Sequence, residues 1–286
     1  MICSLCPRKC NIDRSKNTGF CGVGDEFIIS RAAPHFWEEP CISGKNGSGT
    51  VFFAGCSLGC VFCQNYKISH TAYGKKTDAD GVLKIFRSLE KQGCHNINLV
   101  TADHYIPHLL PLLKKSGIKI PFALNTSSYL TVNAVKSLEG TVDIFIADFK
   151  FFDSRVAKKY ADAEDYPEVA KKSVAQMVMQ TGAPVIKNGI MEKGVIVRVL
   201  VLPDNIIDAK RTLKYLYSTF GDSICISIMS QYTPVCDTPY PELSRPLSDR
   251  EYKSVVDFAM HLGIKNCFIQ AKTSADADFI PEFYGD

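Results

Sequence analysis

Residues 49–65 read GTVFFAGCSLGCVFCQN, and the interpretation of the whole chain starts from them. The apolar, β-branched and aromatic run at 50–54 predicts a buried strand. Cys56, Cys60 and Cys63 follow it in the spacing C-x3-C-x2-C. Thiolates this close together can bind three irons of one cuboidal iron–sulfur cluster, which leaves the fourth iron without a protein ligand. Such an iron is open to a further ligand.

Two other interpretations of these three cysteines are a zinc site and a chance group of buried thiols. Structural zinc normally has four ligands and C-x2-C pairs, and no fourth cysteine follows this loop closely, so the spacing favours a cluster. The chain has 12 cysteines, and thiols in a reducing compartment more often bind metal than form disulfides. Three other cysteines are expected to be small buried apolar residues, namely Cys94, Cys225 and Cys267. Cys236 is assigned no role.

From residue 50 onward, short apolar runs alternate with amphipathic stretches of helical period, the pattern of βα units around a parallel sheet. The expected strands are 50–54, 96–100, 121–125, 142–148, 195–201, 223–229 and 266–270. The expected helices lie near 81–92, 106–115, 132–138, 156–181, 206–220 and 249–262. Six or seven units are fewer than the eight of a closed TIM barrel. The sequence therefore predicts an α/β fold, an open, partial βα barrel of about six units that is TIM-barrel-like.

Residues 1–48 lack this alternation and predict a loop-rich, cysteine-organised segment ahead of a barrel at 49–286. The segment contains four closely spaced cysteines: Cys3, Cys6, Cys10 and Cys21. Four thiolates are enough for a closed zinc site or an auxiliary iron–sulfur cluster, and spacing alone does not decide between them. A metal would supply folding energy that so few apolar residues cannot. Cys41 and His35 are spare candidate ligands.

Polar residues close or follow several of the expected strands. The carboxyl ends of parallel strands meet at one edge, so these side chains are expected to line a common face. The candidates are Thr101, His104, Asn125, Asp148, Lys150, Ser230, Gln231 and Tyr232. Arg198 lies within an expected strand and suits bidentate binding of a carboxylate from a cofactor or substrate. A polar strand end or a solvated salt bridge would look the same in sequence.

Composition argues against several classes of protein. No apolar run reaches the roughly 18 residues of a membrane span, and the N-terminus lacks the apolar stretch of a secretory signal, which predicts a cytoplasmic location. The net charge is +3, with acidic and basic residues interleaved rather than gathered in a basic stripe. We therefore expect neither nucleic acid nor a membrane as a partner.

The C-x3-C-x2-C motif, with the aromatic Phe62 before its last cysteine, resembles the signature of the radical S-adenosylmethionine (SAM) superfamily. Nearly the whole chain resembles pyruvate formate-lyase-activating-enzyme-like proteins, in CSLCPRKC (3–10), SRAAPHFWEEPCISG (30–44), GSGT (47–50), CQNYKIS (63–69), DFK (148–150) and MSQY (229–232). The resemblance implies a 4Fe-4S cluster on the three motif cysteines, with SAM chelating the open iron. Reductive cleavage of SAM then gives a 5'-deoxyadenosyl radical that abstracts hydrogen from a substrate.

The resemblance also implies which other residues contact SAM. Superfamily members commonly carry a Gly-Gly-Glu-like motif after the second strand, but this chain has Val-Thr-Ala-Asp-His there, so Thr101, Asp103 or His104 take that role in this interpretation. His104 is alternatively a proton carrier, because imidazole titrates near neutrality. Asp148 and Lys150 resemble the Asp-x-Lys of activating enzymes, in which these charges contact the nucleoside or methionine part of SAM.

The likeness constrains the cofactor more than the substrate, so three functions are compared. The first is an activase that forms a glycyl radical in a protein partner. The second is an enzyme acting on a small molecule or peptide, for which a sealed, polar-lined pocket is expected. The third is a non-catalytic metal-binding or electron-transfer protein, which has no use for an open iron. Both enzyme hypotheses imply a low-potential electron donor of the flavodoxin or ferredoxin type.

Overall fold

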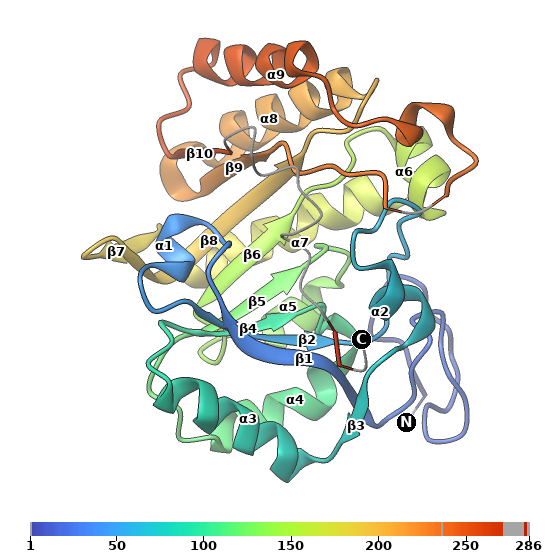
Figure 1. Ribbon diagram of the computed structural model, residues 1–286, viewed down its shortest axis with the longest axis vertical. Helices are drawn as coiled ribbons and strands as arrows, with labels where there is room; N and C mark the ends of the chain where they lie inside the picture. Colours follow the sequence, from blue (N-terminus) through green and yellow to red (C-terminus); the bar gives the residue numbers. More distant parts are fainter. Residues whose placement is uncertain (1, 236, 271–282, 285–286) are drawn as a thin grey trace.

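Seven parallel strands form most of a ten-stranded sheet in the computed structural model, which describes residues 2–235, 237–270 and 283–284 (Figure 1). They are β2 (Ser48–Phe53), β4 (Ile97–Val100), β5 (Phe122–Thr126), β6 (Ile144–Asp148), β8 (Ile190–Leu200), β9 (Cys225–Met229) and β10 (Cys267–Ile269). Each parallel strand lies beside the one before it in the chain, as in a βα barrel. Cys236 lies outside the described residues.

The sheet does not close into a full barrel. Within the described part of the chain its outermost strands are β10 and β3 (Lys75–Thr77), and these do not pair with each other. Six parallel strands are each followed by a helix, and β10 adds a seventh strand at the edge. The predicted open, partial βα barrel of about six units is therefore confirmed.

The helices that follow the strands lie on the outer side of the sheet, except α6, which lies near the carboxyl ends of the strands (Figure 1). They are α3 (Ala79–Lys91), α4 (Ile106–Lys115), α5 (Val132–Ser137), α6 (Ser154–Ala161), α7 (Tyr166–Thr181), α8 (Ile206–Phe220) and α9 (Asp249–His261). The single helix expected at 156–181 is wrong, because the chain breaks between α6 and α7. Asp162 has a left-handed φ of 47° at the end of α6, and Pro167 lies in the first turn of α7. No described helix combines the length and apolar character that a bilayer span requires.

Strand β1 (Phe27–His35) corrects the prediction that residues 1–48 are loop-rich throughout. It pairs antiparallel with β2 and β3, so one edge of the sheet is antiparallel. Arg31 and Pro34 interrupt its apolar pattern, which hid the strand in the sequence. Before β1, residues 2–26 form loops with one isolated bridge, as expected. The division of the chain at residue 48 stays a prediction.

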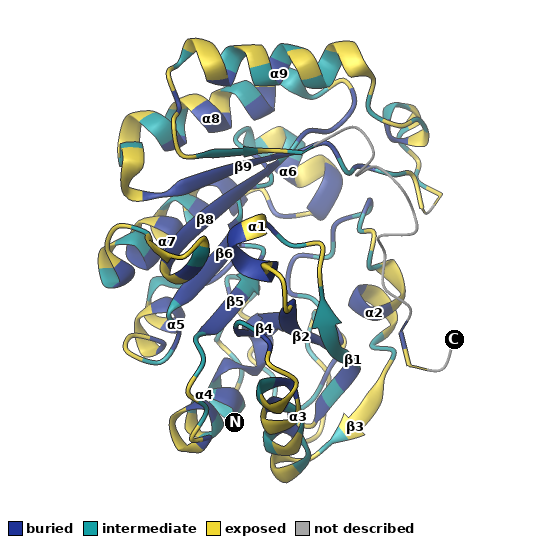
Figure 2. Ribbon diagram, turned by 60° about the vertical axis from the view of Figure 1, so that its left-hand side comes forward, coloured by how far each residue is buried: buried dark blue, intermediate teal, exposed yellow. Residues whose placement is uncertain are grey.

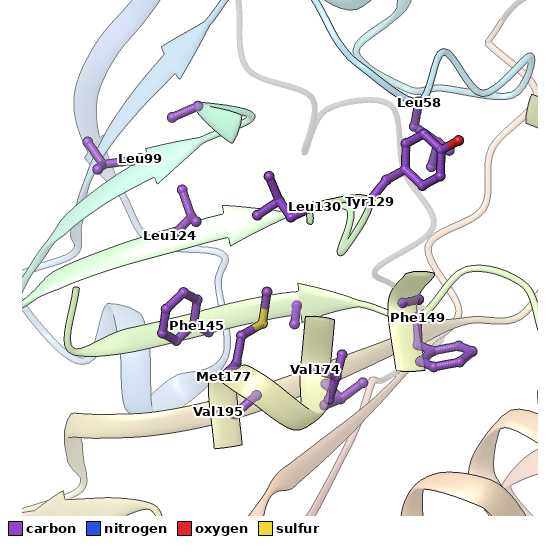
Figure 3. Packing of buried hydrophobic residues seen from close by; sticks show 14 of the residues in the cluster. Leu58, Leu99, Leu124, Tyr129, Leu130, Phe145, Phe149, Val174, Met177 and Val195 are labelled. Atoms are coloured by element: carbon purple, nitrogen blue, oxygen red, sulfur yellow. The ribbon is translucent and has the colours of Figure 1, made fainter. Parts of the chain in front are cut away.

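Alternate residues of the central strands face opposite sides of the sheet. Leu124, Phe145 and Val195 face outward, where Phe145 and Val195 lie beside Val174 and Met177 of α7 (Figure 3). These side chains are at most 1% exposed, and each is worth about 1.5–3 kcal/mol of hydrophobic stabilisation. The residues between them face inward and form a separate cluster, which includes Ala123, Ile144, Ile146 and Ile196.

The inner side of the barrel is filled near the amino ends of the strands. Helix α1 (Pro40–Ser43) lies in front of β5 and β6 (Figure 2), and its Cys41 and Ile42 belong to the inner cluster. The Nδ2 of Asn96, just before β4, donates to the carbonyl of Ile42 at 2.9 Å. We call residues 35–44 the plug. Because the plug occupies this end, the remaining space inside the barrel opens at the carboxyl ends of the strands.

Candidate functional site

A cavity of about 790 Å³ lies at the carboxyl ends of the strands, within the size range of ligand pockets. The loop after β2 forms one wall of it, and the plug forms part of its inner end. Residues named from the sequence that line the cavity are His35, Cys56, Cys60, Phe62, Cys63, Thr101, Asn125, Asp148, Lys150, Arg198, Gln231, Tyr232 and Cys267, and Cys267 is only partly buried. Asp103, His104 and Ser230 do not line it. Residues far apart in the chain are thus brought to one face.

Cys56, Cys60 and Cys63 lie on the loop between β2 and α2 (Tyr66–Thr71), which we call the cluster loop (55–65). Burial, reinforced by the nearby Cys63 thiol, raises the pKa of Cys56 to about 11. Burial also raises the pKa of Cys60, although Lys150 opposes the shift. A bound metal would therefore favour the thiolate forms of Cys56 and Cys60.

The donor set suits an iron–sulfur cluster. A cuboidal cluster takes one thiolate at each of three irons, and three separate thiols line one wall of the cavity. The backbone N–H of Leu58 also donates to Cys56 Sγ at 3.4 Å, which stabilises negative charge on that sulfur.

Packing and a close backbone contact fix the two ends of the cluster loop. Phe62 is buried, and its ring lies edge-on to Phe151 and Tyr160 at 6.0 and 6.1 Å, which anchors the residue before Cys63. At the other end, Gly55 has a φ of 84°, and an added Cβ would lie 2.4 Å from the carbonyl oxygen of Cys21. Only glycine fits there.

The segment after β4 places three predicted residues differently. Thr101, with a left-handed φ of 57°, lines the cavity. Asp103 is buried, and its Oδ2 accepts a hydrogen bond from Thr126 at 2.8 Å, but burial still raises the pKa of Asp103 to about 7. The imidazole of His104 is buried with its Nε2 2.9 Å from the carbonyl of Ala54, and burial lowers its pKa to about 4. His104 therefore lies behind the cavity wall as a neutral side chain.

Asp148 and Lys150 extend from the carboxyl end of β6 into the cavity wall. Lys150 Nζ lies 2.6 Å from Asp148 Oδ2, and the two side chains are 19% and 23% exposed. Burial opposes the charge of Lys150, but Asp148 and Cys60 outweigh burial, so the pKa of Lys150 is raised. The lysine thus stays a cation at the wall that it shares with the cysteines.

Arg198 on β8 binds two carboxylates of the plug. Its Nε donates to Glu39 Oε1 at 2.8 Å, and its Nη2 contacts both Glu39 and Glu38. Glu38 Oε1 also accepts from Asn98 Nδ2 at 3.0 Å and from Asn125 Nδ2 at 3.4 Å. The sequence predicts that Arg198 binds a carboxylate of the cofactor or substrate, whereas the carboxylates bound to it here belong to the chain itself.

Glu38 and Glu39 were not predicted as part of the site, although both line the cavity. Their side chains are 8% and 6% exposed. Burial opposes ionisation of Glu39, but Arg198 outweighs burial, so the pKa of Glu39 is lowered and the group stays charged. The signal in the sequence is a pair of adjacent acidic residues inside the otherwise aromatic run HFWEEP.

The four cysteines of the N-terminal segment lie near one another. Cys6 is buried, which raises its pKa to about 11, and the thiols of Cys3, Cys10 and Cys21 add to this shift. The backbone N–H of Phe20 donates to Cys10 Sγ at 3.4 Å. The role of these four cysteines as ligands of zinc or of an auxiliary iron–sulfur cluster stays a prediction. The spare candidates lie elsewhere, since Cys41 is in the plug and His35 lines the cavity.

Comparison with known proteins identifies the family. The family model described as the radical SAM superfamily matches residues 50–216, which is more than half of the chain and includes the cluster loop. The chain belongs to the radical SAM superfamily. A relative of this radical SAM protein is an uncharacterized protein of Methanocaldococcus jannaschii, 28% identical over 268 residues, which cover 90% of this chain and 74% of the relative.

Solved structures share the radical SAM fold at low sequence identity. SuiB of Streptococcus suis bound to the precursor peptide SuiA has a TM-score of 0.50 and 14% identity, over 76% of this chain and 46% of SuiB. SuiB bound to S-adenosylmethionine has a TM-score of 0.50 and 13% identity, over 75% of this chain and 47% of SuiB. A domain of pyruvate-formate lyase-activating enzyme from Bacteroides vulgatus has a TM-score of 0.43 and 17% identity, over 58% of this chain and 92% of that domain. The chain thus spans about half the length of SuiB, and the likeness to SuiB concerns the fold alone.

Membership of the radical SAM superfamily implies a 4Fe-4S cluster and SAM, and the cavity has residues that fit both. When bound, they supply one-electron cleavage of the sulfonium, which leaves a carbon radical. The motif cysteines would provide the thiolates, and Thr101 and Asn125 would offer polar groups from neighbouring strand ends. The ion pair on β6 adds a carboxylate and an ammonium at the same wall. Phe62 packs edge-on against Phe151 beside the thiols, of which Cys60 is buried and Cys56 and Cys63 are partly exposed.

Proposed function

We propose that the chain is an enzyme that cleaves SAM reductively at a 4Fe-4S cluster on Cys56, Cys60 and Cys63 and abstracts hydrogen from a substrate bound in the same cavity. One observation carries this proposal: the three cysteines and the polar strand ends line one cavity of about 790 Å³. A cluster, SAM and a substrate must meet in one such space, because a carbon radical has to reach the substrate before water or protein quenches it.

Within this proposal, Thr101, Asn125, Asp148 and Lys150 bind SAM. Lys150 is a largely buried cation at the cavity wall and suits the methionyl carboxylate of SAM. Asp148 accepts hydrogen bonds from an ammonium or from ribose hydroxyls. Of Thr101, Asp103 and His104, the three candidates after β4, only Thr101 lines the cavity, so the proposal assigns the contact with SAM to Thr101. Arg198 is occupied by Glu38 and Glu39, so in this proposal it shapes the pocket instead of binding the cofactor directly.

We propose further that the substrate is a small molecule or a slender peptide. The plug fills the barrel near the amino ends of the strands, so the substrate has a closed, charged floor at Glu38, Glu39 and Arg198 instead of a through-channel. SuiB, which shares this fold, has been solved with a precursor peptide bound, and this supports a peptide as one form of slender substrate.

The second candidate, activation of a glycyl radical enzyme, would place the glycine loop of a folded partner in the same cavity. It is consistent with the open carboxyl face of the barrel, from which a partner would approach. Turnover without a protein partner would favour the first candidate. A glycyl radical that forms only with a partner protein present, seen by electron paramagnetic resonance, would favour the second.

The deciding experiment is anaerobic reconstitution with iron and sulfide, followed by measurement of iron per chain and of 5'-deoxyadenosine formed from SAM with dithionite as reductant. Dithionite stands in for the proposed low-potential donor of the flavodoxin or ferredoxin type. About four irons with cleavage supports one radical-forming cluster and leaves zinc for the N-terminal cysteines, whereas about eight irons supports an auxiliary cluster there. A fully loaded sample that forms no deoxyadenosine with reductant, SAM and candidate substrates contradicts the proposal.

A further inference from the structure

Arg8, in the cysteine-rich segment, reaches the cluster loop from outside. Its Nε donates to the carbonyl of Ser57 at 3.0 Å, and its Nη2 donates to the carbonyl of Leu58 at 2.9 Å. Ser57 and Leu58 lie between Cys56 and Cys60, where the loop must bend to present both thiols to one cluster. One guanidinium thus fixes two successive peptide groups inside the motif.

The same guanidinium also holds the end of α6. Its Nη2 donates to the carbonyl of Ala161 at 2.8 Å and its Nη1 to the carbonyl of Asp162 at 2.6 Å. Carbonyls at the carboxyl end of a helix have no partners within the helix and carry partial negative charge, so a cation is favoured there. A planar fork with five donors can serve four carbonyls at once, which a lysine ammonium cannot do in this geometry.

Two further contacts join the segment to the cluster loop. The ring of Phe20 lies 3.8 Å from the Arg8 guanidinium carbon, and a Cβ added at Gly59 would lie 3.3 Å from that ring. At the start of the loop, the backbone N–H of Cys56 donates to the carbonyl of Cys21 at 3.2 Å. Contacts from residues 8, 20 and 21 therefore reach positions 56–59 of the motif from one side.

We propose that the N-terminal segment, residues 2–26, is a clamp that holds the cluster loop in its cluster-binding shape, with Arg8 as the positioning residue. Arg8 is flanked by Cys6 and Cys10, so the same short turn that gathers these thiols also aims the guanidinium. The clamp acts on the loop backbone and touches no reacting atom. The inference rests on the proposed function only in requiring that a cluster binds at the three motif cysteines.

The test compares Arg8→Lys and Arg8→Gln with the wild-type chain and with Lys16→Gln, which removes a charge from an exposed residue of the same segment. Each protein is reconstituted anaerobically, and cluster loss to an iron chelator is followed by visible absorbance. Both Arg8 variants should lose the cluster at least about tenfold faster than wild type, because several hydrogen bonds to the loop are lost. Their reduced clusters should also give altered electron paramagnetic resonance spectra, while Lys16→Gln behaves as wild type.

Wild-type rates and spectra in both Arg8 variants would overturn the proposal, and so would wild-type behaviour in Arg8→Lys alone, because charge without the fork would then be sufficient. Circular dichroism checks that each variant is folded. If Arg8→Gln does not fold, Phe20→Leu provides a second probe, since it removes the ring over Gly59 and leaves the guanidinium in place. It should speed cluster loss by about threefold or more, and an unchanged rate would count against the clamp. Failure of SAM cleavage in the wild type would refute the proposed function separately.

Discussion

Replacement of Arg198 by methionine should strongly destabilise the fold, because it leaves two buried carboxylates without their cation. The guanidinium binds Glu39 through two nitrogens and also contacts Glu38, and all three side chains are at most 9% exposed. Removing one partner of a buried ion pair costs about 3–5 kcal/mol, since the remaining charge stays desolvated. For a chain of this size, roughly 2 °C of Tm per kcal/mol converts this loss to a fall of about 6–10 °C.

Urea unfolding of the cluster-free protein, followed by circular dichroism, measures this loss directly. In the wild type the pKa of Glu39 is lowered, so the stability due to this pair is present above the usual carboxyl pKa and is lost as pH falls through the lowered value. In Arg198→Met, burial without the cation should instead raise the carboxyl pKa values. The variant then takes up protons on folding. Its loss of unfolding free energy relative to wild type should therefore be larger at about pH 8 than at about pH 5.5.

The matched control is the neutral triple variant Glu38→Gln, Glu39→Gln, Arg198→Met, which removes all three charges. It should regain most of the stability that Arg198→Met loses, because no buried charge is left uncompensated. A loss below about 1 kcal/mol in Arg198→Met, or an equal loss in the triple variant, would refute the assignment of this cluster as a buried, mutually dependent set.

Three further variants test other parts of the site. Cys60→Ala removes one of the thiolates on the cavity wall, so no 5'-deoxyadenosine should form above background in a chromatographic assay, and full activity would contradict the cluster assignment. Gly55→Ala places a Cβ 2.4 Å from the carbonyl of Cys21 and strains a φ of 84°, so about 2 kcal/mol of stability should be lost in urea unfolding; an unchanged midpoint would contradict the close contact. Burial raises the pKa of Asp103 to about 7 despite the bond from Thr126, so the folded state holds this proton more tightly and stability falls as pH rises from about 4 to about 7. Asp103→Asn should flatten that slope, and a slope equal to wild type would exclude a neutral, buried Asp103.

The central part of the fold could be predicted from the sequence because its signals are local. Each inner strand is a short apolar run followed by an amphipathic helix, and the polar residue that closes it is visible as the pattern ends. Asn125 and Asp148 are examples, and both line the cavity. The three motif cysteines were equally accessible, since their spacing alone carries the chemistry.

The plug and its charges could not be predicted because their partners are distant in the chain. Glu39 and Arg198 are 159 residues apart, and the sequence around either residue does not indicate that the other is its partner. Strand β1 was missed because Arg31 and Pro34 break its alternation of apolar and polar residues. The segment is extended because it pairs with β2, and that pairing is not visible in its own residues. His104 looked like a cavity residue because it follows a strand, but the turn after Thr101 directs its imidazole toward Ala54.

The plug and the cluster loop come from two different stretches of sequence. The region that matches the superfamily starts at residue 50, whereas residues 35–44, which form the floor of the cavity, lie before it. Under the proposed function, the motif cysteines and most of the floor therefore come from separate segments, which Arg198 joins through Glu38 and Glu39. Exchange of this short segment between related chains, together with the residue at position 198, offers a route to new substrates that leaves the cluster loop unchanged.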